Sequence, residues 1–539
     1  MITLLDYGAG NVRSVINAIE SLGETVHIAR RAEEIAGAER LVFPGVGAFG
    51  SMMQILNQKG YVEPLRDYLK SGRPFFGICL GMQALFETSA EAFATEGLGI
   101  LKGTVKRFDI DLAVPHIGWN GINVKKPSRI FNGLSGNEKF YFVHSYYIAP
   151  ADDAVILTSS DYGVEFASSV QAGPIIGTQF HPEKSGRAGQ LLLANFLAVD
   201  RTKVTPPEIL TGTKLAKRII ACLDVRSNDQ GDLVVTKGDQ YDVREEGIVR
   251  NLGKPVELAE RYYREGADEI TFLNITGFRD FPLEDMPMIA VLKQTSQHVF
   301  VPLTIGGGIR DYTDANGRTY TALEVAAEYF RSGADKVSIG SDAVLIVEEC
   351  LRTGEKTGQS AIETISRVYG NQAVVISVDP RRVYVPSPDA VEQHVIATAI
   401  PGPSGEAYCW YQCTIKGGRE GRDLDAVTLA KACEELGAGE ILLNCIDKDG
   451  TNSGFDIELI NAVKQAVTIP VIASSGAGNA QHFEEVFRRT AAEAALAAGI
   501  FHRREVPIDA VKTYLDGKVE IRKTDRNENG GGPCNAPGN

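Results

Sequence analysis

The stretch RIIACLDV, residues 218–225, is an apolar run that contains an aspartate near its end, and part of it is echoed by VISVD at 375–379. Three more motif pairs recur in the same order: TFLNI (271–275) with LLNCID (442–447), TIGGGI (304–309) with ASSGAG (473–478), and VSIGS (337–341) with LAAGI (496–500). Self-similarity of this kind is the signature of a repeated architecture. The region is therefore expected to consist of two fused half-barrels.

Eight strand-like segments follow one another in this region, and helical segments such as 255–267 and 424–439 separate them. The strand candidates are 218–225, 268–275, 299–305, 335–341, 372–379, 440–447, 468–474 and 492–498. This count and alternation predict a (β/α)8 TIM barrel. An eight-stranded open sheet shares the alternation, and only the count and spacing disfavour it.

The first 200 residues show a second α/β pattern, in which apolar runs end in turns and alternate with amphipathic segments such as 11–23. The apolar runs lie at 2–8, 40–49, 73–81, 139–147 and 174–183. The pattern predicts a doubly wound, mostly parallel sheet with helices on both faces. A ligand is expected at the carboxyl ends of its strands.

The chain is expected to divide into four segments. Around residues 199–214 the periodicity lapses into Pro, Thr and Lys, as in a linker. The predicted segments are a first α/β domain at 1–202, a linker at 203–214, the barrel at 215–520, and a polar, glycine-rich tail at 521–539 that is expected to be disordered.

Composition sets the limits on function. A chain of 539 residues is too long for one ordinary core, and a net charge of -14 excludes a general nucleic-acid binder. No apolar run is long enough for a membrane span, and residues 1–11 resemble neither a signal nor a transit segment. A cytoplasmic location is expected, and a plastid location would require a transit segment removed before residue 1. The eight cysteines are scattered singly, which suits a reducing compartment. Cys409 and Cys413 have no second Cys or His pair nearby, so they are expected to pack rather than to bind metal.

The motif GICLG at 77–81 places Cys79 between two glycines after an apolar run. Small residues two positions before and after a nucleophile permit the tight strand-to-helix turn that exposes it, as in G-x-S-x-G. The N–H groups after such a turn can stabilise a tetrahedral oxyanion. A buried structural cysteine is the commoner alternative.

The motif FHPE at 180–183 favours the nucleophile. His181 can accept the thiol proton, and Glu183 can hold the imidazole in the required tautomer. A lone histidine in a loop is more often a surface or capping residue, but a cysteine elbow and this motif at two strand ends of one domain seldom coincide. The first domain is therefore predicted to carry a Cys-His-Glu triad.

Residues 1–200 resemble the class I glutamine amidotransferases, through PGVGAFG (44–50), GICLGMQ (77–83), VHSYY (143–147) and QFHPEKSG (179–186). The resemblance implies that Cys79 attacks the side-chain amide of L-glutamine, releases ammonia and leaves a thioester for water. It implies that Gly47 and Leu80 supply N–H groups. The residues implied to hold glutamine are Gln83, Glu91, His144, Ser145 and Tyr146, although Glu91 could equally be a solvated charge at a helix end.

Two aspartates end symmetry-related strands of the predicted barrel. Asp224 ends the first strand motif and Asp379 the fifth, so both should point into one mouth from opposite sides. Paired carboxylates suggest general acid and base work. A helix-capping role is the alternative for either residue alone.

Glycine-rich turns follow the same symmetry, because GGGIR (306–310) and IGS (339–341) oppose SSGAG (474–478) and AAGIF (497–501). Backbone N–H groups in such turns can bind anions. Two opposed sites predict a ligand with a phosphate at each end. The residues expected to face phosphate are Gly307, Gly308, Gly340, Ser341, Gly450, Thr451, Ser475, Gly476, Ala498 and Gly499.

Residues 1 to about 520 resemble the fused imidazole glycerol phosphate synthases of histidine biosynthesis, through motifs such as KRIIACLDV (217–225), LTIGGGIRD (303–311) and GAGEILLNCIDKDGTNSG (437–454). The resemblance implies that ammonia converts phosphoribulosyl-formimino-aminoimidazole carboxamide ribotide into imidazole glycerol phosphate and aminoimidazole carboxamide ribotide. It implies that Asp224 and Asp379 are the principal acid and base, with Lys237 and Asp449 assisting, although Lys237 could instead be an ordinary exposed loop lysine. It implies no metal and no organic cofactor.

Charged residues of alternating sign lie at or near the starts of four barrel strands: Arg218, Glu269, Lys336 and Glu440. Any one of them alone would be a solvated charge, but four can neutralise one another as a ring at the barrel floor. The family resemblance makes this ring a gate for ammonia. Trp119 and Asn120 are then expected at the interface between the domains.

Other functions stay open at this stage. The first domain could be fused to a different phosphosugar barrel enzyme, such as the related ribotide isomerase or a pyridoxal-phosphate-type synthase. The chain could also be a non-catalytic scaffold that binds a phosphorylated ligand. Both domains lie in one chain, which is expected to be a monomer.

Overall fold

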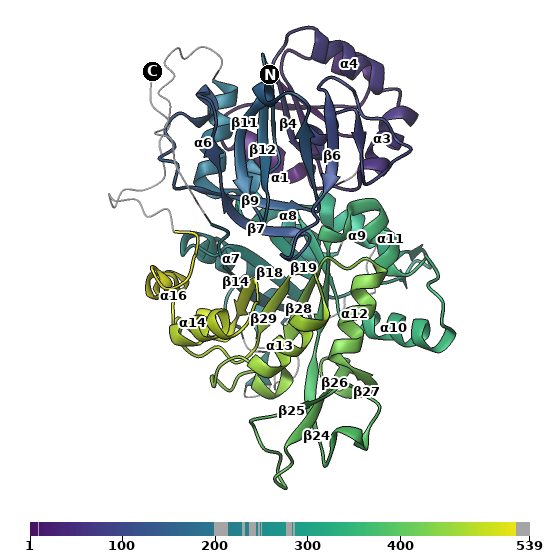
Figure 1. The fold of residues 1–539 in the computed structure, drawn as a ribbon, viewed down its shortest axis with the longest axis vertical. Helices are drawn as coiled ribbons and strands as arrows, with labels where there is room; N and C mark the ends of the chain where they lie inside the picture. The colour runs from purple at the N-terminus through teal and green to yellow at the C-terminus, as the bar shows by residue number, and fades with distance from the viewer. Residues whose placement is uncertain are drawn as a thin grey trace.

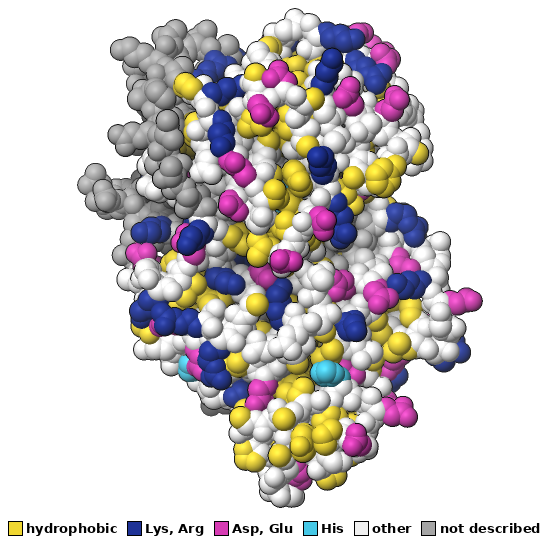
Figure 2. All heavy atoms as spheres, viewed as in Figure 1, with side chains coloured by type: hydrophobic (Ala, Val, Ile, Leu, Met, Phe, Trp, Pro, Cys, Tyr) yellow, Lys and Arg dark blue, Asp and Glu magenta, His cyan; other side chains and the backbone are white. Residues whose placement is uncertain are grey.

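The computed structural model describes residues 1–8, 10–198, 214–228, 232–236, 244–245, 248–249, 251–275, 283 and 286–523. Two bodies are stacked along the long axis (Figure 1). The first domain lies at the top of that view, and the barrel lies below it. Acidic and basic side chains are intermixed on the face shown in Figure 2. Within the described residues, every helix is too short or too polar to span a bilayer.

The first domain is built on an eight-stranded sheet with the order β2-β1-β3-β4-β13-β12-β11-β8. Its strands are β1 (Ile2–Leu5), β2 (Val26–Ala29), β3 (Leu41–Gly45), β4 (Phe75–Cys79), β8 (Asn123–Val124), β11 (Ile156–Asp161), β12 (Glu165–Ala172) and β13 (Ile175–Thr178). The strands from β2 to β13 pair in parallel, and the last three pair antiparallel. The prediction of a mostly parallel α/β sheet is confirmed.

Helices cover both faces of this sheet, because the strand residues that point to one face and those that point to the other are both apolar. Phe75 of β4 packs in one buried cluster with Met52 and Leu65, and its neighbour Phe76 packs in another with Val15 and Phe196. The helices are α1 (Val12–Glu20), α2 (Ala32–Ala36), α3 (Phe49–Gln58), α4 (Val62–Lys70), α5 (Leu80–Gln83) and α6 (Gly186–Leu197). The domain is therefore doubly wound.

The strand-like run at 139–147 lies outside the central sheet. It forms β9 (Lys139–His144), which pairs antiparallel with β7 (His116–Gly121), and β10 (Tyr146–Pro150), which belongs to a three-stranded sheet with β6 (Gly103–Arg107) and β5 (Thr88–Ser89). The pair β7 and β9 lies where the first domain meets the barrel (Figure 1).

The second domain is a closed barrel of eight parallel strands, because β14 pairs with both β18 and β30. The strands are β14 (Arg218–Ser227), β18 (Glu269–Asn274), β19 (Leu303–Gly306), β22 (Lys336–Ile339), β23 (Val374–Val378), β28 (Glu440–Asn444), β29 (Val471–Ser474) and β30 (Ala494–Ala497). Each strand falls within a segment predicted from the sequence or overlaps it. The predicted TIM barrel is confirmed.

The barrel helices are α7 (Pro255–Arg264), α8 (Pro287–Thr295), α9 (Ala322–Arg331), α10 (Ser341–Thr353), α11 (Ala361–Tyr369), α12 (Ala426–Leu436), α13 (Ile457–Ala466), α14 (Ala480–Arg489), α15 (Gly499–His502) and α16 (Ile508–Leu515). Their starts follow local capping chemistry. Thr321 and Ser360 form capping boxes at α9 and α11, and Asp456 caps α13.

The long segment at 384–406 contributes to an inserted antiparallel sheet after β23, made of β24 (Pro380–Val385), β25 (Val395–Ala397), β26 (Tyr408–Ile415) and β27 (Glu420–Asp425). Cys409 and Cys413 lie buried in β26 as free thiols, which agrees with their predicted packing role. Arg382 of β24 forms a buried ion pair with Asp456 and anchors the inserted sheet to α13. The other interruption, at 311–322, contains a short hairpin of β20 (Tyr312–Thr313) and β21 (Thr319–Tyr320).

The first three residues of the predicted tail, 521–523, are described by the structure. Ile521 forms a bridge with Lys217, and the buried Arg522 binds Asp268 and stacks over Trp119, so residues 521–523 are part of the packed structure. A cation–π contact and a buried carboxylate hold this segment, which composition alone did not indicate. The remaining tail and most of the predicted linker lie outside the described residues.

Two candidate active sites and the ion-pair ring between them

Cys79 occupies a strained turn between β4 and α5. Its backbone has a φ of 52°, in a region that residues other than glycine rarely adopt. A Cβ on Gly77 would lie 2.7 Å from the carbonyl oxygen of Gly81, and one on Gly81 would lie 2.0 Å from that of Phe43. The two glycines of the motif are therefore required for the turn that holds the cysteine at the end of its strand.

His181 and Glu183 lie beside this turn. The Nδ1 atom of His181 is 2.7 Å from Oε1 of Glu183, and both side chains are buried. Burial lowers the pKa of His181, but the carboxylate of Glu183 and the sulfur of Cys79 more than offset this, so the pKa stands well above 6.5. The three predicted triad residues are thus brought together with the imidazole between the sulfur and the acid.

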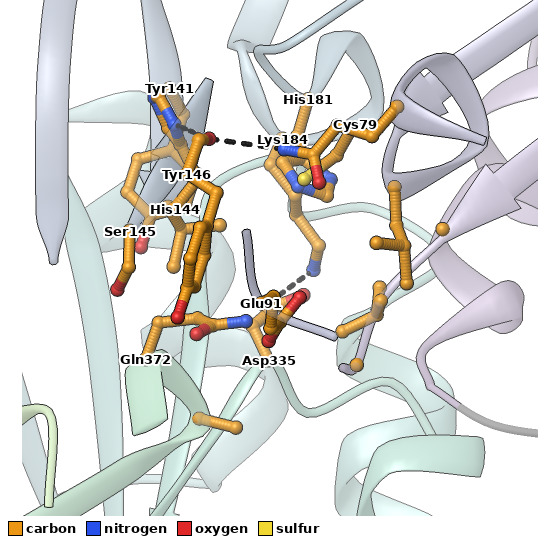
Figure 3. Close-up of a pocket in the computed structure, with 17 residues that line it drawn as sticks. Cys79, Glu91, Tyr141, His144, Ser145, Tyr146, His181, Lys184, Asp335 and Gln372 are labelled. Carbon is orange, nitrogen blue, oxygen red and sulfur yellow. Dashed lines mark hydrogen bonds and ion pairs between the residues drawn. The ribbon is translucent and has the colours of Figure 1, made fainter. Parts of the chain in front are cut away.

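A pocket opens in front of Cys79. Cys79 and His181 face His144 and Tyr146 across it (Figure 3). The other residues of the first domain that were predicted for this site and that line the pocket are Gly47, Leu80, Gln83, Glu91 and Ser145. Glu183 does not line it but lies behind His181. The barrel contributes Asp335, Gln372 and Ala373 to the wall, so the pocket is completed by both domains.

The carbonyl oxygen of Tyr146 is held from two sides. Nε2 of Gln83 donates to it at 3.0 Å and Nδ1 of His144 at 2.7 Å. The other nitrogen of His144 accepts from Nδ1 of His116 at 3.2 Å. Burial lowers the pKa of His144 to about 3, so this histidine is neutral. In this structure Gln83 and His144 therefore brace the start of β10 at Tyr146, just after the bend that carries Ser145.

Glu91 and Ser145 hold the neighbouring segments in place. Glu91 accepts a hydrogen bond from the backbone N–H of Phe49 at 2.9 Å, and burial raises the pKa of its carboxyl group. Ser145 donates to Asn371 of the barrel at 3.1 Å. Gly47 has a φ of 125°, and a Cβ there would lie 2.9 Å from the carbonyl oxygen of Val368 in α11.

Three residues of this site were not assigned a role from the sequence. Lys184 forms an ion pair with Asp335 of the barrel at 2.7 Å, visible at the bottom of the pocket in Figure 3. Tyr141 lines the pocket, and its hydroxyl has no hydrogen-bond partner among the described residues. Gln179 is fully buried against Cys79. The motif QFHPEKSG (179–186) contains both Gln179 and Lys184, and it is the signal that could have drawn attention to them.

A second pocket lies at the carboxyl ends of the barrel strands. Asp224, Asp379 and Asp449 all line it, so the predicted paired aspartates share one mouth. Burial raises the pKa of Asp379, and Nδ2 of Asn444, which donates to it at 2.8 Å, lowers it. Lys237 lies outside the described residues.

The predicted phosphate turns divide into two groups. Gly450, Ser475, Gly476, Ala498 and Gly499 line the pocket, whereas Gly307, Gly308, Gly340, Ser341 and Thr451 are not among the described residues of its wall. Ser341 lies at the rim, because its hydroxyl accepts from the N–H of Lys416 and the next residue, Gly417, lines the pocket. Ser475 has a φ of 72°, so the position that carries serine here adopts a backbone conformation suited to glycine.

Arg218, Glu269, Lys336 and Glu440 form a closed ring of ion pairs, and each is the first residue of its strand. Arg218 contacts Glu269 at 2.8 Å and also pairs with Glu440. Lys336 lies 2.7 Å from Glu269 and 2.6 Å from Glu440. All four side chains are fully buried, which requires the mutual neutralisation that the sequence predicted.

The interface between the domains uses Trp119 but not the side chain of Asn120. The indole Nε1 of Trp119 donates to the carbonyl oxygen of Asp268, next to Glu269 of the ring, at 3.0 Å. Nδ2 of Asn120 donates instead to the backbone carbonyl oxygen of Asp161, in its own domain, at 2.8 Å. Successive residues of a strand point in opposite directions, so only one of the two can face the barrel. The expectation for Asn120 is therefore corrected.

In the described part of the chain, no three His, Cys, Asp or Glu side chains lie close enough together to bind a metal ion.

Cys222 lies in the barrel pocket, where burial and then the charges of Asp224 and Asp449 raise the pKa of its thiol well above the ordinary value. This thiol is therefore protonated at neutral pH.

Comparison with known families covers both domains. A model of the class I glutamine amidotransferases matches residues 3–199, and a model described as histidine biosynthesis protein matches residues 218–507. The chain is 59% identical to imidazole glycerol phosphate synthase hisHF, chloroplastic, of Arabidopsis thaliana, over 97% of this chain and 89% of that protein. It is 56% identical to imidazole glycerol phosphate synthase hisHF of Schizosaccharomyces pombe, over 96% and 98%. It is 42% identical to the HisF subunit of Methanosphaera stadtmanae, over 57% and 99%.

Proposed function

The chain belongs to the bifunctional imidazole glycerol phosphate synthase family, and on that premise we propose which of its residues perform each step. It is an enzyme of histidine biosynthesis that joins a glutaminase to a cyclase in one chain. Glutamine is the nitrogen donor. The roles of individual residues and the identity of the cyclase substrate are proposals.

In the glutaminase reaction, the thiolate of Cys79 attacks the side-chain carbonyl carbon of glutamine. The tetrahedral oxyanion is stabilised by the N–H groups of Gly47 and Leu80, which both line the pocket. Protonated His181, held by Glu183, gives its proton to the leaving nitrogen, and ammonia departs. Water activated by the now neutral His181 then hydrolyses the thioester to glutamate and restores the thiolate.

The glutamine is held by the wall opposite the nucleophile. Glu91 receives its ammonium group, and the segment from His144 to Tyr146, braced by Gln83, receives its carboxylate end. The supporting observation is that these residues line one pocket with Cys79, together with Gln372 of the barrel. Because the barrel forms part of the wall, its state can influence the geometry of glutamine binding.

In the cyclase reaction, Asp224 and Asp379 act as acid and base, and Asp449 assists. Burial raises the pKa of Asp379, which favours its protonated form and suits a group that gives and takes a proton. The proposed substrate is the bis-phosphorylated ribotide phosphoribulosyl-formimino-aminoimidazole carboxamide ribotide. One phosphate binds at Ser475, Gly476, Ala498 and Gly499, and the other binds at the rim near Ser341 and the turns that contain Gly307, Gly308 and Gly340. Lys237 is proposed to close over the substrate.

Ammonia passes from one pocket to the other through the barrel. Tyr141 lines the glutamine pocket, and its side chain packs against Trp119, which binds the residue next to Glu269 of the ring, so it lies between the two. Neutral ammonia that leaves Cys79 would cross the ring without meeting bulk water, where it would become ammonium. The ring residues are therefore proposed to gate its passage.

The organisation of the whole chain follows the same proposal. The glutaminase domain is placed at 1–202 and the barrel at 215–520, with a linker between them. A monomer is proposed, because one chain contains both halves of the glutamine pocket. A cytoplasmic location is proposed, and the name of the Arabidopsis relative makes a plastid the alternative.

The observation that carries the proposal is that one chain places a Cys-His-Glu pocket and an aspartate-lined pocket on opposite sides of a buried ion-pair ring. The test is Cys79→Ala. Glutamine-dependent synthesis of imidazole glycerol phosphate is expected to be lost, while synthesis from added ammonia is retained. Loss of both activities in a folded protein would contradict the two-site assignment.

A further inference from the structure

Gln179 lies in the QFHPE motif between β13 and His181, and its side chain is fully buried. Its Nε2 atom donates to the sulfur of Cys79 at 3.4 Å. Its backbone N–H donates to Ser168 at 2.8 Å and fixes the main chain at this point. The side chain therefore approaches the sulfur as a rigidly held amide.

The orientation of this amide follows from a chain of hydrogen bonds. The carbonyl oxygen of Tyr146 can only accept, so the side-chain nitrogen of Gln83 must face it. The same nitrogen donates its second hydrogen to Oε1 of Gln179 at 3.0 Å. With its oxygen fixed in this way, Gln179 must present its N–H group to Cys79. A backbone carbonyl thus determines which atom of Gln179 meets the sulfur.

A donor aimed at sulfur favours the thiolate over the thiol, because a hydrogen bond to an ionised acceptor is stronger than one to a neutral acceptor. The effect applies twice in a thioester mechanism. The thiolate is the nucleophile in the first half, and it is the leaving group when water hydrolyses the thioester. Between these steps the sulfur carries no charge, so the donor stabilises the charged states selectively.

We propose that Gln179 is a further catalytic residue of the glutaminase, which stabilises the Cys79 thiolate by donating the Nε2–H hydrogen bond that Gln83 and Tyr146 orient. The inference rests on the proposed role of Cys79 as the nucleophile. Through the same hydrogen bonds, Gln179 links the sulfur to the strand that is proposed to bind glutamine. It also explains why Gln83 is directed inward to Gln179.

The test is Gln179→Met in the full chain, because methionine has a similar shape but no N–H group. The pH dependence of Cys79 alkylation by iodoacetamide is followed by mass spectrometry of the Cys79 peptide. The midpoint is expected to rise by about one pH unit, and glutaminase kcat/KM to fall about tenfold. The other titratable or charged groups near the sulfur stay in place in this variant: His181 with Glu183 behind it, Tyr7, and Glu91 and Lys184 in the pocket wall.

The matched control is Gln171→Met, because Gln171 lies in β12 of the same domain and its amide donates only to the carbonyl oxygen of Gly173 among the described residues. The control is expected to leave the midpoint unchanged. Circular dichroism and thermal unfolding show whether each variant is folded, because synthesis from ammonia reports only on the barrel. If Gln179→Met does not fold, the isosteric Gln179→Glu is used, and it should raise the midpoint further because it places an acceptor beside the thiolate.

The outcomes separate this inference from the proposed function. If Cys79 is the alkylated residue and Cys79→Ala abolishes glutaminase activity, an unchanged midpoint in a folded Gln179 variant overturns the inference alone. If Cys79→Ala retains glutaminase activity, the proposed function itself fails. A raised midpoint together with retained ammonia-dependent synthesis supports the inference.

Discussion

The Nζ atom of Lys184 lies 2.7 Å from the Oδ2 atom of Asp335, across the boundary between the two domains. Lys184 follows Glu183 of the proposed triad directly, and Asp335 precedes Lys336 of the ring directly. One ion pair therefore links the backbone of the glutaminase site to the backbone of the barrel floor. The pair is buried on the lysine side, where only 2% of the side chain is exposed.

Asp335→Asn is expected to lower glutamine-dependent turnover by about 10-fold to 100-fold, because it leaves the buried charge of Lys184 without its partner, a defect that costs roughly 3–5 kcal/mol. Synthesis from added ammonia should change little. The measurement is steady-state turnover with each nitrogen source. The control is Glu435→Gln, which breaks an ion pair with Lys356 in which both side chains are more than half exposed, and should affect neither activity. Equal losses with both nitrogen sources would contradict the predicted role of this pair.

Much of the fold could be predicted because the barrel strands are short apolar runs with a repeated order. RIIACLDV and its echo identified β14 and β23, and the other strands followed from the same spacing. The inserted sheet could not be predicted in this way. Its strand β25 has three residues and lies among prolines, and it is stabilised by pairing with β26 rather than by its own pattern.

The residues of the candidate site that lie in short sequence motifs could be predicted. Local spacing predicts Cys79, His181 and Glu183, because a tight turn requires flanking glycines and the acid lies two residues after the histidine. Lys184 and Asp335 could not be paired, because they lie 151 residues apart and meet only when the domains dock. Gln179 was not assigned a role, because its contact with Cys79 depends on an orientation that Tyr146 imposes through space.

Glu183→Gln is expected to lower glutaminase kcat/KM by about 10²-fold to 10⁴-fold, the range associated with a general acid or base. Burial lowers the pKa of His181, and the neutral amide removes the largest attraction that opposes this, so a smaller share of the imidazole should be protonated. With less imidazolium, Cys79 should be alkylated more slowly at pH 7 and only at higher pH reach the rate of the unchanged protein. Alkylation rates between pH 5 and 10 measure this effect.

The ion pair of His181 and Glu183 also makes the free energy of unfolding depend on pH. The pKa of His181 in the folded protein is raised above 6.5, so its contribution to the free energy of unfolding is complete below about pH 6.5 and is lost as the pH rises through the folded pKa. Glu183→Gln should remove this part of the pH dependence. Urea unfolding at several pH values would show it, and an identical dependence in both proteins would contradict the assigned ion pair.

Asn444→Ala is expected to move the acid limb of the cyclase pH profile upward by about one unit, because it removes a hydrogen bond to the ionised carboxylate of Asp379. Burial, which already raises the pKa of Asp379, is then less opposed. The profile is measured with ammonia at a constant concentration of the free base, so that glutaminase chemistry does not contribute. Ser377→Ala is the graded control, since its hydroxyl lies 3.4 Å from the same carboxylate and should give a smaller shift.

Lys336→Met tests the ring. It leaves Glu269 and Glu440 with Arg218 as their only partner among the described ring residues, so the free energy of unfolding should fall by roughly 3–5 kcal/mol. If the ring directs ammonia into the barrel, glutamate formed should exceed imidazole glycerol phosphate formed, instead of matching it. The double variant Lys336→Met, Glu440→Met removes one charge of each sign and should recover most of the stability. If the two products stay equal in both variants, the ring has a structural role only. If glutamate is in excess in the restabilised double variant, the loss of channelling is separate from the loss of stability.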